Sequence, residues 1–373
     1  MPFHSAQHVP GNFARIPATT TPQGRNFRVA LMYKNFGRTP SGHIGLGVTA
    51  NQTCKYLQAK GIYCDVWGCN NFDDLKARIV QARTEPPGIH PLTHIVISAP
   101  WLGAEDLQDI AILNPSLDFI VVSHSNVGFL AADPNAFKLI RDYMHVEASV
   151  PNFHLAGNSS RLATWVQKTY SMPCWTIPNL YYLDATTAQP HRVPFNGDLV
   201  RIGCFGAQRL LKNILSAGAA ALTIANTLRV DLEFYINSGR VEGPQGTLAS
   251  LHQMFSGLRY AKLIEVPWEE WSPFRTTVAH MDLMMQPSYT ESFNVVTADG
   301  IARGVASVVG RAIEWAPSKW VAAVDDPDDI ARVGESLLLS RNAAVDGLNA
   351  LTAHNEKGFQ EWAKYLTDTT PHL

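Results

Sequence analysis

The chain has 373 residues, of which 46% are hydrophobic, and a formal net charge of -2. This length exceeds what one hydrophobic core usually supports, so we expect two domains. No run approaches the ~20 apolar residues that span a bilayer, and the first residues lack the apolar block of a secretory signal, which predicts a cytoplasmic protein. An odd number of cysteines without a CxxC pair argues against disulfides and zinc, and predicts buried thiols at Cys54, Cys64, Cys69, Cys174 and Cys204.

Basic residues gather at the start of the chain. No acidic residue precedes Asp65, whereas seven basic residues do: Arg15, Arg25, Arg28, Lys34, Arg38, Lys55 and Lys60. A basic front on an acidic body suggests an anionic partner. The alternative is an ordinary solvated surface, because seven charges are few beside those of a dedicated nucleic-acid domain.

Residues 1–26 show no sustained period and predict an irregular basic arm. From Phe27 onward, short apolar runs alternate with helical patterns. We expect strands at 28–33, 62–68, 93–99, 117–123 and 152–157, a Gly-rich loop at 37–47, and helices at 48–60, after Trp101 and at 159–170. Gly61 is placed to end the first helix. This alternation is typical of a parallel sheet that is covered on both faces.

The loop-like segment 176–198 contains three prolines and predicts a domain junction. After it we expect strands at 199–206, 232–237, 261–267, 282–287 and 306–310, with helices at 212–228, around 270–280, at 295–304 and from about 329 to 365. The predicted fold class is therefore α/β, with two Rossmann-like, doubly wound domains that face a central cleft. The predicted divisions are 1–26 (arm), 27–190 (first domain), 191–345 (second domain) and 346–373 (C-terminal helix).

The segment PSYTESFNVVTADGIARGVASVV at 287–309 carries two carboxylates eight residues apart. Glu291 follows a predicted strand, and Asp299 lies inside a helix that begins near Asn294. The free N–H groups of that helix end suit a phosphate, and the two carboxylates are placed to bind hydroxyls of a sugar and of a ribose. Acids are also common near helix N-termini for dipole reasons, so the motif alone leaves both interpretations open.

This segment resembles the donor-binding signature of retaining GT-B glycosyltransferases, in the large family that includes glycogen synthases, sucrose synthases and many bacterial mannosyltransferases. Their pattern is P-S-x-x-E-x-F-G, a second Glu eight residues after the first, and A-x-G-x-P-V-V. The matching residues are Pro287, Ser288, Glu291, Phe293, Ala302, Gly304, Val308 and Val309. The resemblance implies that Glu291 contacts the donor sugar and Asp299 the ribose. Asn294 replaces the usual Gly, and Asp299 the usual second Glu.

A second match is RIGCFGAQRLLKN at 201–213. The family places Gly-Arg after a strand and a Lys about six residues after the Gly, and these two cations neutralise the donor diphosphate. Gly206 and Lys212 keep that spacing, Ala207 replaces the Arg, and Arg209 is the predicted substitute. A cationic clamp stabilises the negative charge that builds on a leaving nucleoside diphosphate. Ordinary surface bases are a weaker interpretation, because cations are disfavoured at a helix N-terminus.

Weaker similarities follow in the family's order. Gly45 and Gly47 fall in the Gly-rich loop after the first strand, and His124 follows the strand where many members place a His beside the sugar and the acceptor. A structural histidine is the alternative for His124. The resemblance thus implies His124 and Glu291 as catalytic residues. The implied donor-binding residues are Gly45, Gly47, Gly206, Arg209, Lys212, Ser292, Phe293, Asn294, Val295 and Asp299.

The resemblance implies transfer of a sugar from a nucleotide diphosphate sugar, with UDP as the expected nucleotide and with retention of anomeric configuration. No D-x-D motif ends a strand, and the acidic DDPDD at 325–329 falls in the family's late loop. We therefore expect no cofactor and no essential metal, with Arg209, Lys212 and the helix end at Asn294 supplying the positive charge. A C-terminal helix that crosses back to the first domain is also usual in this architecture.

The acceptor is expected on the first domain, whose basic start favours double-stranded DNA, such as a hydroxymethylated pyrimidine of phage DNA in the host cytoplasm. The expected acceptor residues are Arg15, Arg25, Arg28, Lys34, Arg38, His43 and Asn126. Phe13, Phe36 and Phe129 are candidates to fill the gap left by a flipped base, or plain core aromatics. A protein or glycan acceptor is the alternative. A sugar-nucleotide epimerase and a non-catalytic nucleotide-sugar-binding protein are the alternatives of other classes.

Overall fold

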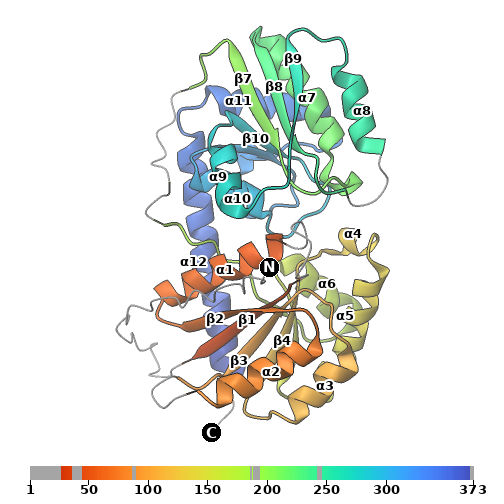
Figure 1. Ribbon diagram of the computed structural model, residues 1–373, viewed down its shortest axis with the longest axis vertical. Helices are drawn as coiled ribbons and strands as arrows, with labels where there is room; N and C mark the ends of the chain where they lie inside the picture. Colours follow the sequence, from red (N-terminus) through yellow and green to blue (C-terminus); the bar gives the residue numbers. More distant parts are fainter. Residues whose placement is uncertain are drawn as a thin grey trace, which may run out of the picture.

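The computed structural model describes residues 27–35, 44–85, 90–184, 187, 194–241 and 246–369. The predicted basic arm and the start of the predicted Gly-rich loop lie outside these residues. The described chain forms two α/β domains, one above the other in Figure 1, each built on one parallel sheet.

The first sheet has six parallel strands in the order β2-β1-β3-β4-β5-β6. Its strands are β1 (Arg28–Lys34), β2 (Tyr63–Cys69), β3 (His94–Ser98), β4 (Asp118–Ser123), β5 (Phe153–Gly157) and β6 (Trp175–Thr176). The expected strands of this half therefore form, within a residue or two at each end. The inner strands β3 and β4 are buried along their whole length, as in parallel sheets that are covered on both faces, whereas the edge strand β2 is partly exposed.

Helices cover both faces of this sheet. They are α1 (Ile44–Ala59), α2 (Phe72–Arg83), α3 (Ala104–Ile112), α4 (Val127–Leu130), α5 (Pro134–Glu147) and α6 (Ser160–Tyr170). The first helix starts four residues earlier than expected, so Gly45 and Gly47 lie in the first turn of α1 and not in a loop. It ends at Ala59, two residues before Gly61, which terminates the helix as expected: its φ of 83° is in the left-handed region that glycine accepts.

The second sheet has five parallel strands in the order β11-β10-β7-β8-β9. Its strands are β7 (Leu199–Cys204), β8 (Asp231–Asn237), β9 (Ala261–Val266), β10 (Leu283–Gln286) and β11 (Ser307–Val309). Its helices are η1 (Leu210–Lys212), α7 (Ile214–Leu228), α8 (Gly246–Phe255), α9 (Trp271–Ala279), α10 (Val295–Ala302), η2 (Ser318–Trp320) and α11 (Pro327–Leu339). Read from β9, the strand order is the 3-2-1-4-5 of Rossmann domains, and it reverses between β7 and β10.

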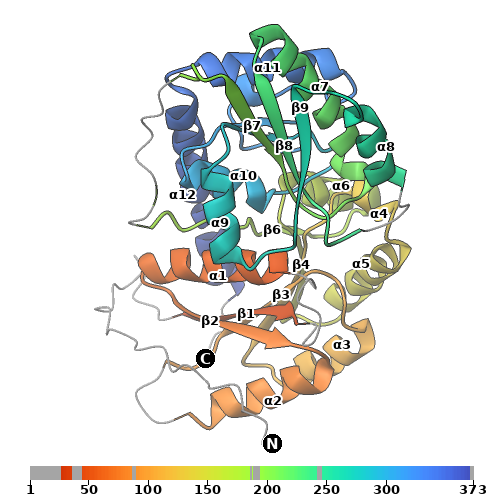
Figure 2. The same cartoon turned by 45° about the horizontal axis from the view of Figure 1, so that its top comes forward.

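The helical tail is two helices, because α11 ends at Leu339 and α12 (Ala343–Thr369) begins after a short break. At 27 residues α12 is about 40 Å long, and it passes from the upper domain to the lower one (Figures 1 and 2). Leu351 packs in the core of the second domain, whereas Trp362, Tyr365 and Leu366 complete the core of the first. One helix thus belongs to both cores.

All five cysteines are free and buried, in agreement with the prediction. Within the described ranges, no helix combines the length and apolar character that crossing a bilayer requires.

Candidate active site

The loops that follow β7 and β10 lie side by side, because these two strands are neighbours in the sheet. This is the point at which the strand order reverses, where open α/β sheets collect their ligands. The loop after β7 carries Lys212, and the loop after β10 carries Glu291. Their side chains form an ion pair in which the Lys212 ammonium donates to the Glu291 carboxylate. The fold therefore joins two residues 79 positions apart.

The Glu291 carboxylate is held in its charged form. Only 11% of each side chain of the pair with Lys212 is exposed. Burial acts to raise the pKa of Glu291, but the positive charges of Lys212 and Arg209 outweigh burial and lower this pKa below its usual value. A buried carboxylate paired with cations in this way is typical of functional sites.

Asn294 stands where the similar motif has a glycine, and the backbone at this position accommodates the difference. Its φ of 61° lies in the left-handed region, where the family's glycine would be free of strain and where Asn is the best-tolerated alternative. Its side-chain oxygen accepts from the Thr297 N–H and caps α10, while its amide donates to Glu291 Oε1 at 3.2 Å and to Gln286 at 3.1 Å. Asn294 thus orients the carboxylate and also begins the helix.

The loop after β7 turns at Gly206, whose φ of 124° is strained for any residue with a side chain. Its N–H donates to Asn237 at the end of β8. Ala207, where the family has Arg, is buried. The Arg209 guanidinium lies over the ring of Phe129 on the first domain, with 4.8 Å between its Cζ and the ring centroid.

A pocket with a cavity volume of about 210 Å³ opens between the two domains beside this loop. Gly45 and Val48 of α1 line it from the first domain. From the second domain it is lined by Gly206, Ala207, Arg209, Lys212, Asn237, Arg240, Trp268, Glu269, Trp271, Phe274, Val295, Val296 and Asp299. Six of the predicted donor residues therefore share one pocket: Gly45, Gly206, Arg209, Lys212, Val295 and Asp299.

Asp299 lies at the wall of this pocket and is 1% exposed. Its Oδ1 accepts two hydrogen bonds, from the Tyr181 hydroxyl at 2.7 Å and from Trp271 Nε1 at 2.9 Å. Burial raises the pKa of Asp299 to about 6, against the two hydrogen bonds and the charges of Arg275 and Arg303, which lower it. The carboxylate is therefore already engaged with neighbouring side chains.

The loop that carries Glu291 is bonded to the first domain. Asn126 donates to the main-chain carbonyl of Glu291, and the Ser292 hydroxyl donates to the carbonyl of His124 at 2.7 Å. Asn158 donates in turn to Ser292 at 3.0 Å. Asn126 and Ser292, expected to contact acceptor and donor respectively, are used here to join the domains.

Phe293 and Gly47 are packed away from the pocket. Phe293 is 3% exposed, with ring centroids 5.4 Å from Trp315 and 5.3 Å from His354. Gly47 faces the Tyr33 ring, where an added Cβ would lie 3.2 Å from a ring carbon. Both residues therefore pack against neighbouring side chains and do not line the pocket.

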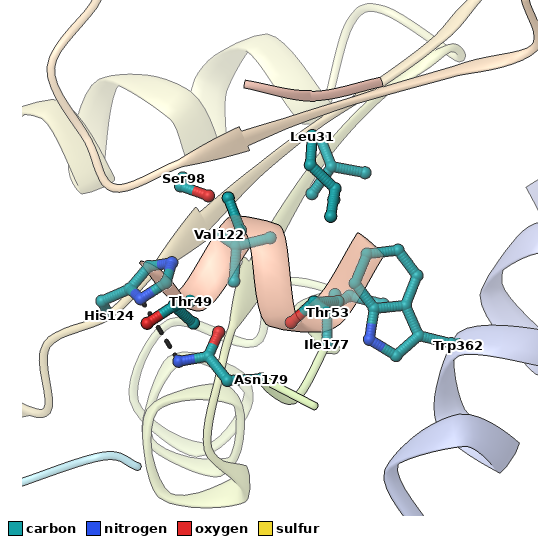
Figure 3. Close-up of a pocket in the computed structure, with 11 residues that line it drawn as sticks. Leu31, Thr49, Thr53, Ser98, Val122, His124, Ile177, Asn179 and Trp362 are labelled. Carbon is teal, nitrogen blue, oxygen red and sulfur yellow. Dashed lines mark hydrogen bonds between the residues drawn. The ribbon is translucent and has the colours of Figure 1, made fainter. Parts of the chain in front are cut away.

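His124 follows β4 and lines a small cavity beneath α1. Figure 3 shows His124 beside Thr49 and Asn179 at one end of this cavity and Trp362 at the other. Its Nδ1 lies 3.5 Å from the Asn179 amide nitrogen. Burial lowers the pKa of His124 to about 4, so this imidazole is neutral at physiological pH.

The predicted acceptor residues are dispersed. Arg15, Arg25, Arg38 and His43, together with Phe13 and Phe36, lie outside the described residues. Arg28 is buried at the start of β1, where its guanidinium pairs with Asp65 at 2.7 Å and with Glu85. Its charge is thereby neutralised inside the first domain, so Arg28 does not belong to the proposed acceptor site. Lys34 lies over the Trp101 ring at 5.4 Å.

Residues that the sequence reasoning missed complete the pocket. Trp268 and Trp271 follow β9, and Asn237 ends β8. Tyr181 of the interdomain segment does not line the pocket but donates to Asp299 in its wall. The aromatic-rich PWEEW after a predicted strand was the available signal for the two tryptophans, because ligand-binding loops follow strand ends. Among the described residues, no three or more His, Cys, Asp or Glu side chains are grouped to hold a metal ion.

Neither a protein-family model nor a curated protein matches this sequence. Solved structures do match. A trehalose-6-phosphate synthase, OtsA, aligns with 93% of this chain and 99% of its own, with a TM-score of 0.63 and 10% identity. HepE from Anabaena, in complex with UDP and glucose, aligns with 91% of this chain and 99% of its own, with a TM-score of 0.57 and 13% identity.

The chain has the GT-B fold. Its six- and five-stranded parallel sheets are the two Rossmann-like domains of that fold, as predicted. A third GT-B structure, TarM from S. aureus in complex with fondaparinux, α-GlcNAc-glycerol and UDP, aligns over 72% of this chain and 55% of its own, with a TM-score of 0.52 and 13% identity. At 10–13% identity, this similarity shows the fold and nothing about function.

Proposed function

We propose that the protein is a retaining glycosyltransferase that takes its sugar from a nucleotide diphosphate sugar, with UDP as the nucleotide. The observation that carries this proposal is the meeting of Lys212, Arg209 and Glu291 at the point where the second sheet reverses its strand order. Lys212 and Arg209 also line the interdomain pocket, and Glu291 is joined to that pocket through its ion pair with Lys212. Two of the similar structures, HepE in complex with UDP and glucose and TarM in complex with α-GlcNAc-glycerol and UDP, support the same class of donor.

The charges define the role of each residue. Lys212 and Arg209 neutralise the donor diphosphate, and the N–H groups at the start of α10 add a partial positive charge. Negative charge builds on the nucleotide as the glycosidic bond breaks, and fixed cations stabilise it most in a site shielded from water. Because these cations are already in place, we propose a reaction without an essential metal ion. A chelator that abolishes transfer would contradict this point.

Glu291 is proposed to contact the sugar hydroxyls. Its carboxylate stays charged and is oriented by Lys212 and Asn294, so its lone pairs are fixed before the donor arrives. His124 is proposed to contact the sugar from the other domain as a neutral donor or acceptor, because its pKa of about 4 excludes an imidazolium at physiological pH.

The test is a donor assay on a matched pair of lysine variants. Lys212→Ala is expected to lower the turnover of labelled UDP-sugars by about 100-fold or more, the size of effect seen when one preorganised group is removed. Lys262→Ala, at an exposed lysine on β9, serves as the control and is expected to have no effect. Equal turnover in Lys212→Ala and wild type would refute the proposed donor site.

The same assay separates the alternatives of other classes. An epimerase converts the UDP-sugar without an acceptor and without releasing UDP, whereas a transferase releases UDP and labels an acceptor. A non-catalytic protein binds UDP-sugars in calorimetry but turns none of them over. Product analysis after incubation with cell lysate therefore distinguishes the three.

For the acceptor we propose a hydroxyl bound on the first domain, opposite the donor pocket. Modified double-stranded DNA is the narrower form of this proposal, and its support is the basic composition before Asp65. Arg28 no longer contributes to that support, because two carboxylates neutralise it. Label in hydroxymethylated DNA would support a DNA acceptor, and label in lysate protein or glycan would support the alternative. Duplex binding that ignores salt would count against DNA.

A further inference from the structure

The two proposed phosphate-binding cations are supported in different ways. Lys212 is held by Glu291 of its own domain. Arg209 lies against Phe129, which belongs to the other domain. We propose that Phe129 is a positioning residue that holds the Arg209 guanidinium at the donor phosphates, so that closure of the two domains contributes to placing this cation. This inference rests on the proposed function.

The contact is a cation–π interaction. The Arg209 Cζ lies 4.8 Å from the Phe129 ring centroid, inside the ~6 Å within which the face of an aromatic ring attracts a guanidinium. Arg209 also lines the donor pocket together with Lys212. The same side chain therefore touches the first domain and faces the place of the diphosphate.

The ring of Phe129 is itself fixed in position by the helix that carries it. Phe129 lies in α4, directly after the strand β4. Asn126, at the start of α4, donates to the carbonyl of Glu291. Gly128 faces Thr290 so closely that an added Cβ would lie 3.3 Å from the Thr290 hydroxyl oxygen. This helix is thus docked on the loop that carries the donor carboxylate, which fixes the backbone from which Phe129 extends.

The local backbone explains why Arg209 needs such support. Position 207 holds a buried alanine, so the charge comes from a residue two positions farther along, whose backbone is extended with φ -148° and ψ 151°. A long guanidinium side chain in this position loses several rotatable bonds of freedom when it binds a phosphate. Packing on a rigid ring reduces that loss, because the side chain is already ordered.

Reciprocal coupling between donor binding and domain closure follows from this arrangement. If closure places Arg209, then a bound diphosphate must in turn stabilise the closed arrangement by the same factor. Sugar transfer would then be confined to the closed state, in which water is displaced from the site.

The experiment is a double-mutant cycle on UDP affinity, measured by calorimetry on the full chain. We expect Phe129→Ala and Arg209→Ala each to weaken UDP binding by about 10-fold, and the double variant to be no weaker than Arg209→Ala alone. Phe129→Leu fills a similar volume without an aromatic face and is expected to lose as much as Phe129→Ala. Phe129→Tyr keeps that face and is expected to bind UDP like wild type.

Two results would overturn the inference. One is wild-type affinity in Phe129→Leu, and the other is a double variant whose loss is the product of the two single losses. The dependence of UDP binding on salt is a second readout, which should weaken in Phe129→Leu as in Arg209→Ala, whereas a change confined to packing would leave it unaltered. If wild-type protein binds no nucleotide at all, the proposed function fails instead.

Discussion

Charged side chains are buried at two places in the molecule, the donor pocket and a cluster in the first domain. The first place lies at the carboxyl ends of its parallel strands, and the second lies at the amino-terminal ends. In the pocket, Lys212 pairs with Glu291 at the carboxyl ends of β7 and β10. In the first domain, His154 lies 3.1 Å from Asp118 and 3.5 Å from Glu147, near the amino-terminal ends of β4 and β5. We call Asp118, Glu147, His154 and Tyr365 the anchor cluster, because the Tyr365 hydroxyl of α12 donates to Asp118 there.

The comparison shows that buried charge alone does not identify a functional site. In the anchor cluster, the rings of Trp175 and Tyr365 lie about the imidazole of His154, with centroids 6.2 and 6.1 Å away. Its charges therefore face protein, whereas Lys212 faces a pocket. A shifted pKa therefore indicates a functional site when the group also faces a pocket and lies at the carboxyl ends of the strands, where ligands bind.

The largest expected effect separates the two clusters by activity. Glu291→Gln removes the charge that holds Lys212 while preserving the shape of the side chain, and we expect kcat/KM for the UDP-sugar to fall by about 100-fold. His154→Gln, in the anchor cluster, is the matched control and should leave the KM for the donor unchanged. A donor KM that responds equally to both changes would remove the distinction between the clusters.

The next effect concerns stability and its pH dependence. Although burial acts to lower it, Asp118 and Glu147 raise the pKa of His154 to about 9, above its unfolded value of about 6.5. The folded state thus retains a proton that the unfolded state loses. The stabilisation is complete below pH 6.5 and is lost as the pH rises to about 9, a change of about 3 kcal/mol. Melting temperatures should show this decline in wild type but not in His154→Gln, and a parallel decline in both would contradict it.

A smaller effect is expected at the pocket wall. The raised pKa of Asp299, about 6, means that stability falls as the pH rises from about 4 to about 6, and that the buried charge costs roughly 1–3 kcal/mol above that. Asp299→Asn keeps an oxygen for Tyr181 and Trp271 but carries no charge. We expect its melting temperature to exceed that of wild type at pH 7.5 and to match it near pH 4. Weaker UDP binding by this variant would support the proposed ribose contact.

The smallest effect is expected where an ion pair is exposed. Lys60 pairs with Glu356 of α12 at 2.9 Å, and 34% and 55% of the two side chains are exposed. Solvent screens such a pair, so Lys60→Ala should cost about 0–1 kcal/mol in thermal or denaturant unfolding. A loss as large as that of His154→Gln would mean that charge at the surface anchors α12 as strongly as buried charge.

Strand positions were predictable because they depend on local pattern, whereas Glu291 and Lys212 were singled out by their resemblance to a family motif, and their roles stay a prediction. Apolar runs fix the strands, and their order along the chain places the loops after β7 and β10 together. The partners of the site residues were not predictable in this way. Tyr181 and Asp299 are 118 residues apart, and the pairing of Arg209 with Phe129 joins two domains. No periodicity in a single sequence specifies such contacts.

The contacts of Arg28 were likewise not predictable from the sequence, and here they remove a predicted role. In the sequence it is one of several unpaired cations, which favours an anionic partner. Its neutralising carboxylates, Asp65 and Glu85, follow 37 and 57 residues later, and only the pairing of β1 with β2 brings Asp65 beside it. A count of charges along the chain therefore overestimated the basic surface of the first domain.

The path of α12 has a consequence for how the chain is made. Trp362, Tyr365 and Leu366 close the core around β1, yet the ribosome adds them only after the whole second domain. The first domain must therefore emerge with part of its apolar interior uncovered, and it completes its core through contacts more than 300 residues apart in sequence. Such late closure exposes a nascent chain to aggregation, so we expect a fragment that ends near residue 184 to require chaperones where the full chain does not.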